Sequence, residues 1–231
     1  MGNETEVKVL DPAFLGSIPA RKPLGQHVYE KLKHAIIRGD IPPGHRFVEI
    51  RVADALGISR TPVREAIHKL EREGLMERLA GGGFTVFHPT LADIEETFGI
   101  RRVLESYAAR LAAVKHKEED LQALEQKIEE FQGCLERGQM DNLPKINTEF
   151  HNLLYAMSQS PKLVKMIKDL RDQIYRFRKI LLNEPSRARI SHEDHRQMLA
   201  AMKKRDVEGA EKLVAEHILR GQEIILGSLG R

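Results

Sequence analysis

The 231-residue sequence contains no tryptophan and a single cysteine, Cys134. One thiol has no partner within its own chain, so an internal disulfide framework is excluded. No stretch approaches the roughly 20 consecutive apolar residues that a membrane-spanning helix requires. Residues 1–20 also lack the basic and then apolar pattern of a secretory signal. We therefore expect a cytoplasmic protein with no membrane partner.

Aromatic residues are also scarce, at 5%, whereas charged residues make up 31% of the chain and the net charge is only +3. This balance is typical of a soluble helical protein, and the length favours two domains. The charge is unevenly distributed, because residues 21–89 hold 12 Lys and Arg against 8 Asp and Glu, while residues 90–231 are near neutral. Such an asymmetry indicates a modest attraction of the first half to phosphate groups.

Three short helices and a hairpin are predicted in the first half of the chain. Each helical segment shows apolar residues at helical spacing and ends at a glycine; the segments are 26–38, 49–56 and about 60–73. Ser59 or Thr61 caps the third segment, and Pro62 is tolerated in its first turn. Two β-prone segments, 75–79 and 84–87, flank three glycines and predict a hairpin. Together these elements predict a winged helix-turn-helix.

Everything beyond Thr90 has the spacing of helices. Thr90 itself can cap a helix that has Asp93 in its first turn. We expect helices near residues 91–115, 118–138, 142–158, 162–182, 190–204 and 206–226. The predicted fold class is therefore mainly α, with an N-terminal winged helix-turn-helix and a C-terminal antiparallel all-helical bundle. The predicted domains are an arm over 1–23, a winged helix-turn-helix domain over 24–89 and an all-helical domain over 90–231. The family resemblance given below implies DNA binding for the winged helix-turn-helix domain and effector binding and dimerisation for the all-helical domain.

The first turn of the third predicted helix carries side chains suited to reading DNA. In a helix-turn-helix, the second helix presents its N-terminal side chains to the major groove. Arg60 and Arg64 offer paired donors that fit guanine, and Thr61 fits a phosphate or a thymine methyl group. At the wing tip, Gly82 leaves room for a close approach to a sugar-phosphate edge. Further candidate phosphate contacts are Arg46, Arg51 and Lys69.

These residues also allow a purely structural module whose arginines lie in solvent. However, the stretch LGISRTPVREA at residues 56–66, followed by EGL at 73–75 and the glycine-rich wing, resembles the GntR family of bacterial regulators. The resemblance implies a dimer that binds a palindromic double-stranded operator through Arg60, Thr61 and Arg64. Many members have Arg directly after the residue that matches Glu49, whereas this chain has Ile there and Arg51 next.

Three histidines on separate predicted helices are candidate metal ligands. Asn147 and His151 are four residues apart on one helix and therefore share a face. His195 and His217 lie on two other helices, so a bundle can bring three imidazoles and an amide oxygen together. The spacing equally allows histidines that are simply exposed or hydrogen-bonded.

The second half of the chain resembles the FCD domain, the effector-binding half of one GntR subfamily. The matching segments are IRRVLE at 100–105, EFH at 149–151, DHR at 194–196 and EH at 216–217. The resemblance implies a divalent cation held by Asn147, His151, His195 and His217, although Asp is commoner at the first of these positions. An imidazole-rich set suits Zn, Ni, Cu or Fe better than Mg or Ca, and we expect Zn or Ni.

Arg101 is the candidate effector anchor. The resemblance places it in the effector cavity, where a guanidinium can bind a carboxylate through two hydrogen bonds. An ion pair within the helix, between Arg101 and Glu105, is the alternative. We expect a small organic acid to bind there and to shift the arrangement of the DNA-binding domains. The resembling family includes activators, but release from DNA is the usual response, so we expect a repressor.

Two other functions use the same histidines. In the first, the regulator holds no metal and the histidines bind the effector directly. In the second, the chain is an enzyme in which a metal on His151, His195 and His217 activates water. The sequence has no H-E-x-x-H-like pairing and no obvious general base, and an enzyme would leave the winged helix unexplained. We therefore expect a regulator and not an enzyme.

Overall fold

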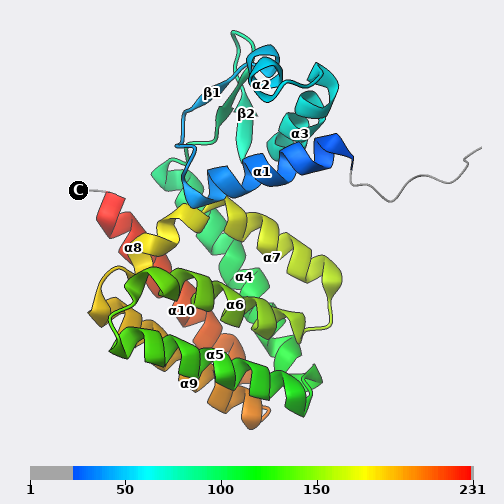
Figure 1. Ribbon diagram of the computed structural model, residues 1–231. Coiled ribbons are helices and arrows are strands. Elements are labelled where there is room, and N and C mark those ends of the chain that lie inside the picture. The colour runs from blue at the N-terminus through cyan, green and yellow to red at the C-terminus, as the bar shows by residue number, and fades with distance from the viewer. Residues whose placement is uncertain (1–22, 230–231) are drawn as a thin grey trace, which may run out of the picture.

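A small winged helix and a larger helical bundle make up the structure (Figure 1). The computed structural model describes residues 23–229, except for the side chains at positions 176, 178 and 179. The arm predicted over residues 1–23 therefore lies outside the described residues, apart from Pro23. Within this described part, none of the helices combines the length and the apolar character of a membrane span.

The winged helix has the predicted helices and hairpin. Its helices are α1 (Leu24–Arg38), α2 (Glu49–Leu56) and α3 (Arg60–Arg72), and its strands are β1 (Arg46–Phe47), β2 (Met76–Arg78) and β3 (Phe84–Val86). Gly39 and Gly57 end the first two helices in the left-handed conformation, with φ of 82° and 64°. The antiparallel sheet has the order β1-β3-β2. The two-residue strand β1 was not predicted, because it is too short to show an alternating pattern.

The second half is entirely helical, as predicted. Its elements are α4 (Leu91–Lys115), α5 (Glu118–Glu136), η2 (Met140–Asn142), α6 (Leu143–Ala156), α7 (Pro161–Gln173), η3 (Tyr175–Phe177), α8 (Arg178–Leu182), α9 (Pro185–Lys203) and α10 (Val207–Leu229). Thr90 caps α4: its hydroxyl accepts a hydrogen bond from the Asp93 amide, and the Asp93 carboxylate accepts one from the Thr90 amide. The mainly α fold class, with a winged helix and a helical bundle, is confirmed.

The prediction of one helix over residues 162–182 is wrong. The chain leaves the helical conformation at Ile174, where φ is −113° and ψ is 9°, and continues through η3 into α8. Ile174 itself is buried, and the preceding Gln173 hydrogen-bonds to the winged helix, so tertiary contacts fix the break. The next helix begins at Pro185 and not at residue 190, because proline is well suited to a first helical position.

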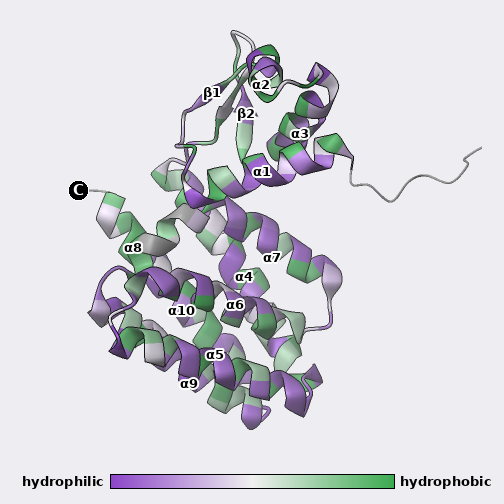
Figure 2. Ribbon diagram, viewed as in Figure 1, coloured by the Kyte–Doolittle hydropathy of each residue, from purple (hydrophilic) through white to green (hydrophobic). Residues whose placement is uncertain are grey.

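Each half has its own apolar core, and α4 is the central helix of the bundle. It packs along α10 and also contacts α6, α7 and α9, while α5 packs on α6 and α9. Phe98, Ala108 and Ala112 of α4 are almost fully buried. Figure 2 shows apolar and polar residues interleaved along the helices of both halves, as expected for helices that are buried on one side.

A hydrogen-bonded junction joins the two halves where α1 lies beside α7 (Figure 1). Lys33 of α1 lies 2.8 Å from the carboxylates of both Glu73, after α3, and Asp172, in α7. Gln173 donates a hydrogen bond to the Glu73 carbonyl (3.1 Å), and Tyr29 donates one to the Glu73 carboxylate (2.6 Å). Burial disfavours the charged lysine, but the two carboxylates hold the pKa of Lys33 above its ordinary value.

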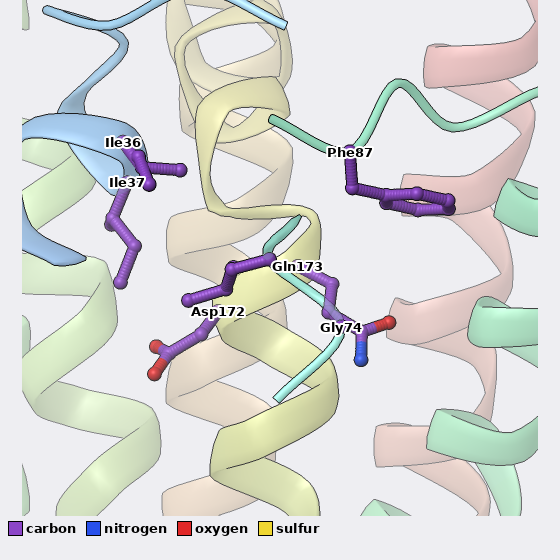
Figure 3. A pocket seen from close by; sticks show the side chains of 7 residues that line it. Ile36, Ile37, Gly74, Phe87, Asp172 and Gln173 are labelled. Carbon is purple, nitrogen blue, oxygen red and sulfur yellow. The ribbon is translucent and has the colours of Figure 1, made fainter. Parts of the chain in front are cut away.

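Figure 3 shows Asp172 and Gln173 at the end of α7, with Ile36 and Ile37 of α1 on one side and Phe87 on the other. The cavity that these residues help to line has a volume of only about 10 Å³. That is at most the space of one water molecule, so this cavity is too small for an organic ligand.

The hydroxyl of Tyr29 should stabilise the protein at neutral pH and lose this effect in alkali. Burial and the hydrogen bond to Glu73 raise the pKa of Tyr29 to about 12. A raised pKa in the folded state stabilises below the unfolded value, near 10, and the contribution falls as the pH rises from about 10 to about 12. The difference in unfolding free energy between wild type and Tyr29→Phe, measured in urea, should therefore be constant up to about pH 9 and shrink above about pH 10. A difference that stays constant from pH 7 to about pH 12 would contradict the prediction.

Candidate functional site

The N-terminal turn of α3 presents the predicted DNA-reading side chains. Gly57 allows the sharp turn that separates α2 from α3. One face of α3 is buried, through Val63, Ala66, Ile67 and Leu70. The opposite face is exposed at Arg60, Thr61 and Arg64, so the helix is anchored by its apolar side and offers its arginines outward.

A groove lies between this helix end and the wing. Its volume is about 300 Å³, and its lining residues are Val48, Glu49, Ile50, Arg60, Arg78, Gly82, Gly83 and Phe84. Arg60 and the wing tip therefore face the same hollow, and the Arg60 guanidinium lies 3.8 Å from the Glu49 carboxylate. Gly82 and Gly83 have φ of 89° and 80°. A Cβ on Gly83 would lie 2.7 Å from the Phe47 carbonyl oxygen, so the wing needs glycine at this position.

Three other basic side chains differ in their surroundings. Arg51 is exposed on α2. Lys69 is directed towards α1, where it donates a hydrogen bond to Gln26 (3.0 Å) and lies 3.8 Å above the Tyr29 ring. Sequence reasoning missed Arg78, which lines the groove from β2 and lies 5.3 Å above the Phe84 ring. Its position three residues before Gly81, at the end of a strand that leads to the wing tip, was the available signal.

The structure brings the three predicted histidines together. His151 of α6, His195 of α9 and His217 of α10 each offer a ring nitrogen, and these atoms all lie within 4.8 Å of one another. Asn147, one turn before His151, is 8% exposed, and its side-chain oxygen Oδ1 has no hydrogen-bond partner among the described residues. Nε2 of His195 is likewise buried without a partner. Unpaired buried polar atoms are costly, so the cluster has the character of a binding site.

Neighbouring side chains orient two of these imidazoles. Nδ1 of His217 lies 2.8 Å from one carboxylate oxygen of Asp194, and Arg220 donates a 2.6 Å hydrogen bond to the other. Nδ1 of His151 lies 3.1 Å from the Tyr155 hydroxyl. Burial opposes the charge of Asp194, but the hydrogen bonds from His217 and Arg220 hold its pKa below the ordinary value. Metal-ligating histidines commonly have such a carboxylate behind them.

The protonation state of His195 also suits a metal ligand. Burial, and next the charge of His217, lower the pKa of His195 well below its ordinary value, so this imidazole is neutral at pH 7. A neutral imidazole is the form that binds a metal. Three imidazoles and one amide oxygen therefore fit a divalent transition metal.

A small cavity opens beside the histidine cluster, with a volume of about 40 Å³. Its polar lining consists of Arg101, Asn147, His151, Arg171 and His217, and its apolar lining comes mainly from α4, α8 and α10. Arg101 makes the ion pair within its helix, through a 2.6 Å hydrogen bond from its Nε to Glu105, and its side chain also lines the cavity.

The carboxylate of Glu105 is fully buried behind Arg101. Tyr155 donates a hydrogen bond to its second oxygen. Burial opposes the charge, but Arg101 and Arg171 hold the pKa of Glu105 below its ordinary value. Arg171 was not predicted. The available signal was its position in the apolar stripe of α7, in line with Leu163 and Ile167.

Comparison with known proteins agrees with both halves of the structure. Residues 24–86 match the family described as bacterial regulatory proteins, gntR family, and residues 96–220 match the FCD domain. The HTH-type transcriptional regulator YdhC of Bacillus subtilis is 32% identical over 190 residues, which cover 82% of this chain and 85% of YdhC. The HTH-type transcriptional repressor RspR of Escherichia coli is 28% identical, over 85% of this chain and 86% of RspR.

The solved structure of E. coli McbR/YncC superposes with a TM-score of 0.76 at 29% identity, over 90% of this chain and 100% of that one. The relatives named here are transcriptional regulators and not enzymes, in agreement with the expectation that this chain is not an enzyme. The chain belongs to the GntR family of bacterial DNA-binding transcriptional regulators, and its C-terminal half is an FCD domain.

Proposed function

We propose that this regulator is a homodimeric repressor which binds a palindromic double-stranded operator, holds a divalent transition metal and responds to a small organic acid. Two features together support this proposal. The start of α3 has exposed arginines beside a glycine-tipped wing, and the helical bundle has a buried histidine cluster that opens into a cavity. The name of RspR, a repressor, supports the sign of regulation. The proposed domains are 24–89 for DNA and 90–231 for effector and dimerisation, joined where Thr90 caps α4.

The operator is read by Arg60, Thr61 and Arg64. These side chains lie at the end of α3 that a helix-turn-helix directs into the major groove. Arg51 of α2 and the backbone at Gly82 supply contacts to the phosphate backbone on either side. Arg78 lines the groove between α3 and the wing, and we include it among the proposed DNA-contacting residues.

Arg64→Ala should weaken binding to the specific operator by about 1 to 3 kcal/mol, because it removes a paired donor from a base edge. The operator is first obtained by selection from random duplexes, and affinity is then measured by fluorescence anisotropy over a range of salt concentrations. Arg72→Ala, at an exposed arginine in the last turn of the same helix, should leave the affinity nearly unchanged. An equal loss on specific and random DNA would reduce Arg64 to a phosphate contact.

The metal is proposed to bind His151, His195 and His217, with the amide oxygen of Asn147 as a further ligand. Zn or Ni fits this set best. When bound, the ion supplies a positive charge to which a carboxylate can bind. Asp194 and Tyr155 set the orientation of two of the rings.

Asn147→Asp should raise metal affinity about tenfold or more, because it replaces a neutral oxygen ligand by an anionic one. Affinity is measured by competition with a chromogenic chelator, and the metal content of the purified protein by plasma mass spectrometry. Asn142→Asp adds the same charge at an exposed position and is the matched control. We expect wild type to contain about one metal ion per chain, and we expect the variants His151→Ala and His195→Ala to contain none. No binding in wild type or in Asn147→Asp would instead favour histidines that contact the effector directly.

Dimerisation is proposed to use an apolar stripe on α4. Ile100, Val103, Tyr107 and Val114 lie on one face of this helix and are 43% to 63% exposed. Exposed apolar groups at such spacing need a partner, and the same face of a second copy is self-complementary around a two-fold axis. That arrangement also matches a palindromic operator.

Val103→Glu should raise the dissociation constant of the dimer about tenfold or more, because it places a charge at the most exposed position of the stripe. Sedimentation velocity over a dilution series measures this. Met166→Glu, at an equally apolar and exposed position on α7, is the control and should leave the dimer intact. Dissociation in both variants, or in neither, would exclude this face as the interface.

The effector acts through linkage between the cavity and the junction. Arg171 lines the cavity, and the next two residues, Asp172 and Gln173, hold the winged helix through Lys33 and Glu73. An acid that binds one arrangement of α7 more tightly shifts the two DNA-binding domains towards it. Repression ends when that arrangement no longer fits the spacing of the operator half-sites.

A further inference from the structure

The effector cavity contains a second guanidinium group, that of Arg171. The residue is 4% exposed and lines the same cavity as Arg101. One of its terminal nitrogens donates a 2.9 Å hydrogen bond to the Asn152 side chain. Its Nε is buried and has no hydrogen-bond partner among the described residues. An unpaired donor on a buried cation is costly, which indicates a place for a bound acceptor.

The charges around the cavity do not balance. Arg101 and Arg171 carry two positive charges, and Glu105 is the carboxylate that both of them face. Of the other acids nearby, Asp194 is bound by Arg220 and His217, and Asp172 by Lys33 at the junction. Among the described residues at the cavity, one positive charge is therefore in excess before any metal is counted. A bound divalent metal would increase this excess.

We propose that the effector is a short dicarboxylate: one carboxylate binds at Arg101 beside the histidine cluster, and the second binds Arg171. This inference rests on the proposed function and names the class of its effector. A second carboxylate accepts a hydrogen bond from the unpaired Nε of Arg171. With a divalent metal bound, the excess at the cavity is three positive charges, of which a dicarboxylate offsets two and a monocarboxylate one. The small cavity, of about 40 Å³, favours short acids.

The competing role for Arg171 is that of a counter-charge for Glu105. In that role it would support the fold and the shape of the cavity, but it would not distinguish one acid from another. The two roles are separated by comparing acids that have the same number of carbon atoms and either one or two carboxylates.

The test is isothermal titration of the full-length, zinc-loaded protein with dicarboxylates from oxalate to glutarate and with the matching monocarboxylates from acetate to pentanoate. At least one dicarboxylate should bind about tenfold or more tightly than its matching monocarboxylate, since its second carboxylate adds a hydrogen bond between charged groups. Arg171→Gln should remove this advantage and leave monocarboxylate affinity within about twofold, and Arg171→Lys should retain part of it. Lys168→Gln, which removes an exposed charge from the same helix, should have no effect.

Thermal unfolding of each variant shows whether it is folded, and Arg171→Lys keeps the buried charge if Arg171→Gln is unstable. Equal affinities of wild type for the matched acids, or an equal loss of both in a folded Arg171→Gln variant, would overturn the dicarboxylate inference alone. Absence of binding by every acid, with zinc bound, would overturn the organic-acid effector of the proposed function and this inference with it.

Discussion

The burial of one carboxylate, that of Glu105, determines how the helical domain is arranged around its cavity. A charge in such a position costs several kcal/mol unless charged and polar partners surround it. Arg101 comes from the preceding turn of α4, Tyr155 from α6 and Arg171 from α7. These three elements are therefore held at fixed distances by a polar group and not only by apolar packing. Because Tyr155 also contacts His151, the same group helps to position the candidate metal ligands.

Local signals in the sequence were sufficient for most of the fold. Gly57 marks the turn of the helix-turn-helix because its left-handed conformation favours glycine, and Thr90 with Asp93 marks the start of α4 because a capping box needs only four residues. The break at Ile174 was not predictable in this way. It depends on contacts between α7 and the winged helix, which are remote in the sequence.

The residues of the candidate sites also differ in whether local sequence signals could predict them. The spacing of Asn147 and His151 predicts that they share a helix face, but the meeting of three helices at the histidine cluster came from the family resemblance. Arg171 and Arg78 were missed because their positions, in the apolar stripe of α7 and near the wing tip, do not by themselves indicate what the side chains contact. Only the neighbours of these side chains in space, Glu105 for one and the α3 groove for the other, reveal their roles.

The end of α7 has a consequence for how this regulator can evolve. Arg171, Asp172 and Gln173 are consecutive, yet the first faces the cavity and the other two hold the winged helix. A substitution at position 171 changes the cavity directly beside the two residues that hold the winged helix. We therefore expect changes in effector preference at this position to alter the affinity of the ligand-free protein for DNA. We expect compensating changes to fall in α1 or after α3, at the residues that contact Asp172 and Gln173.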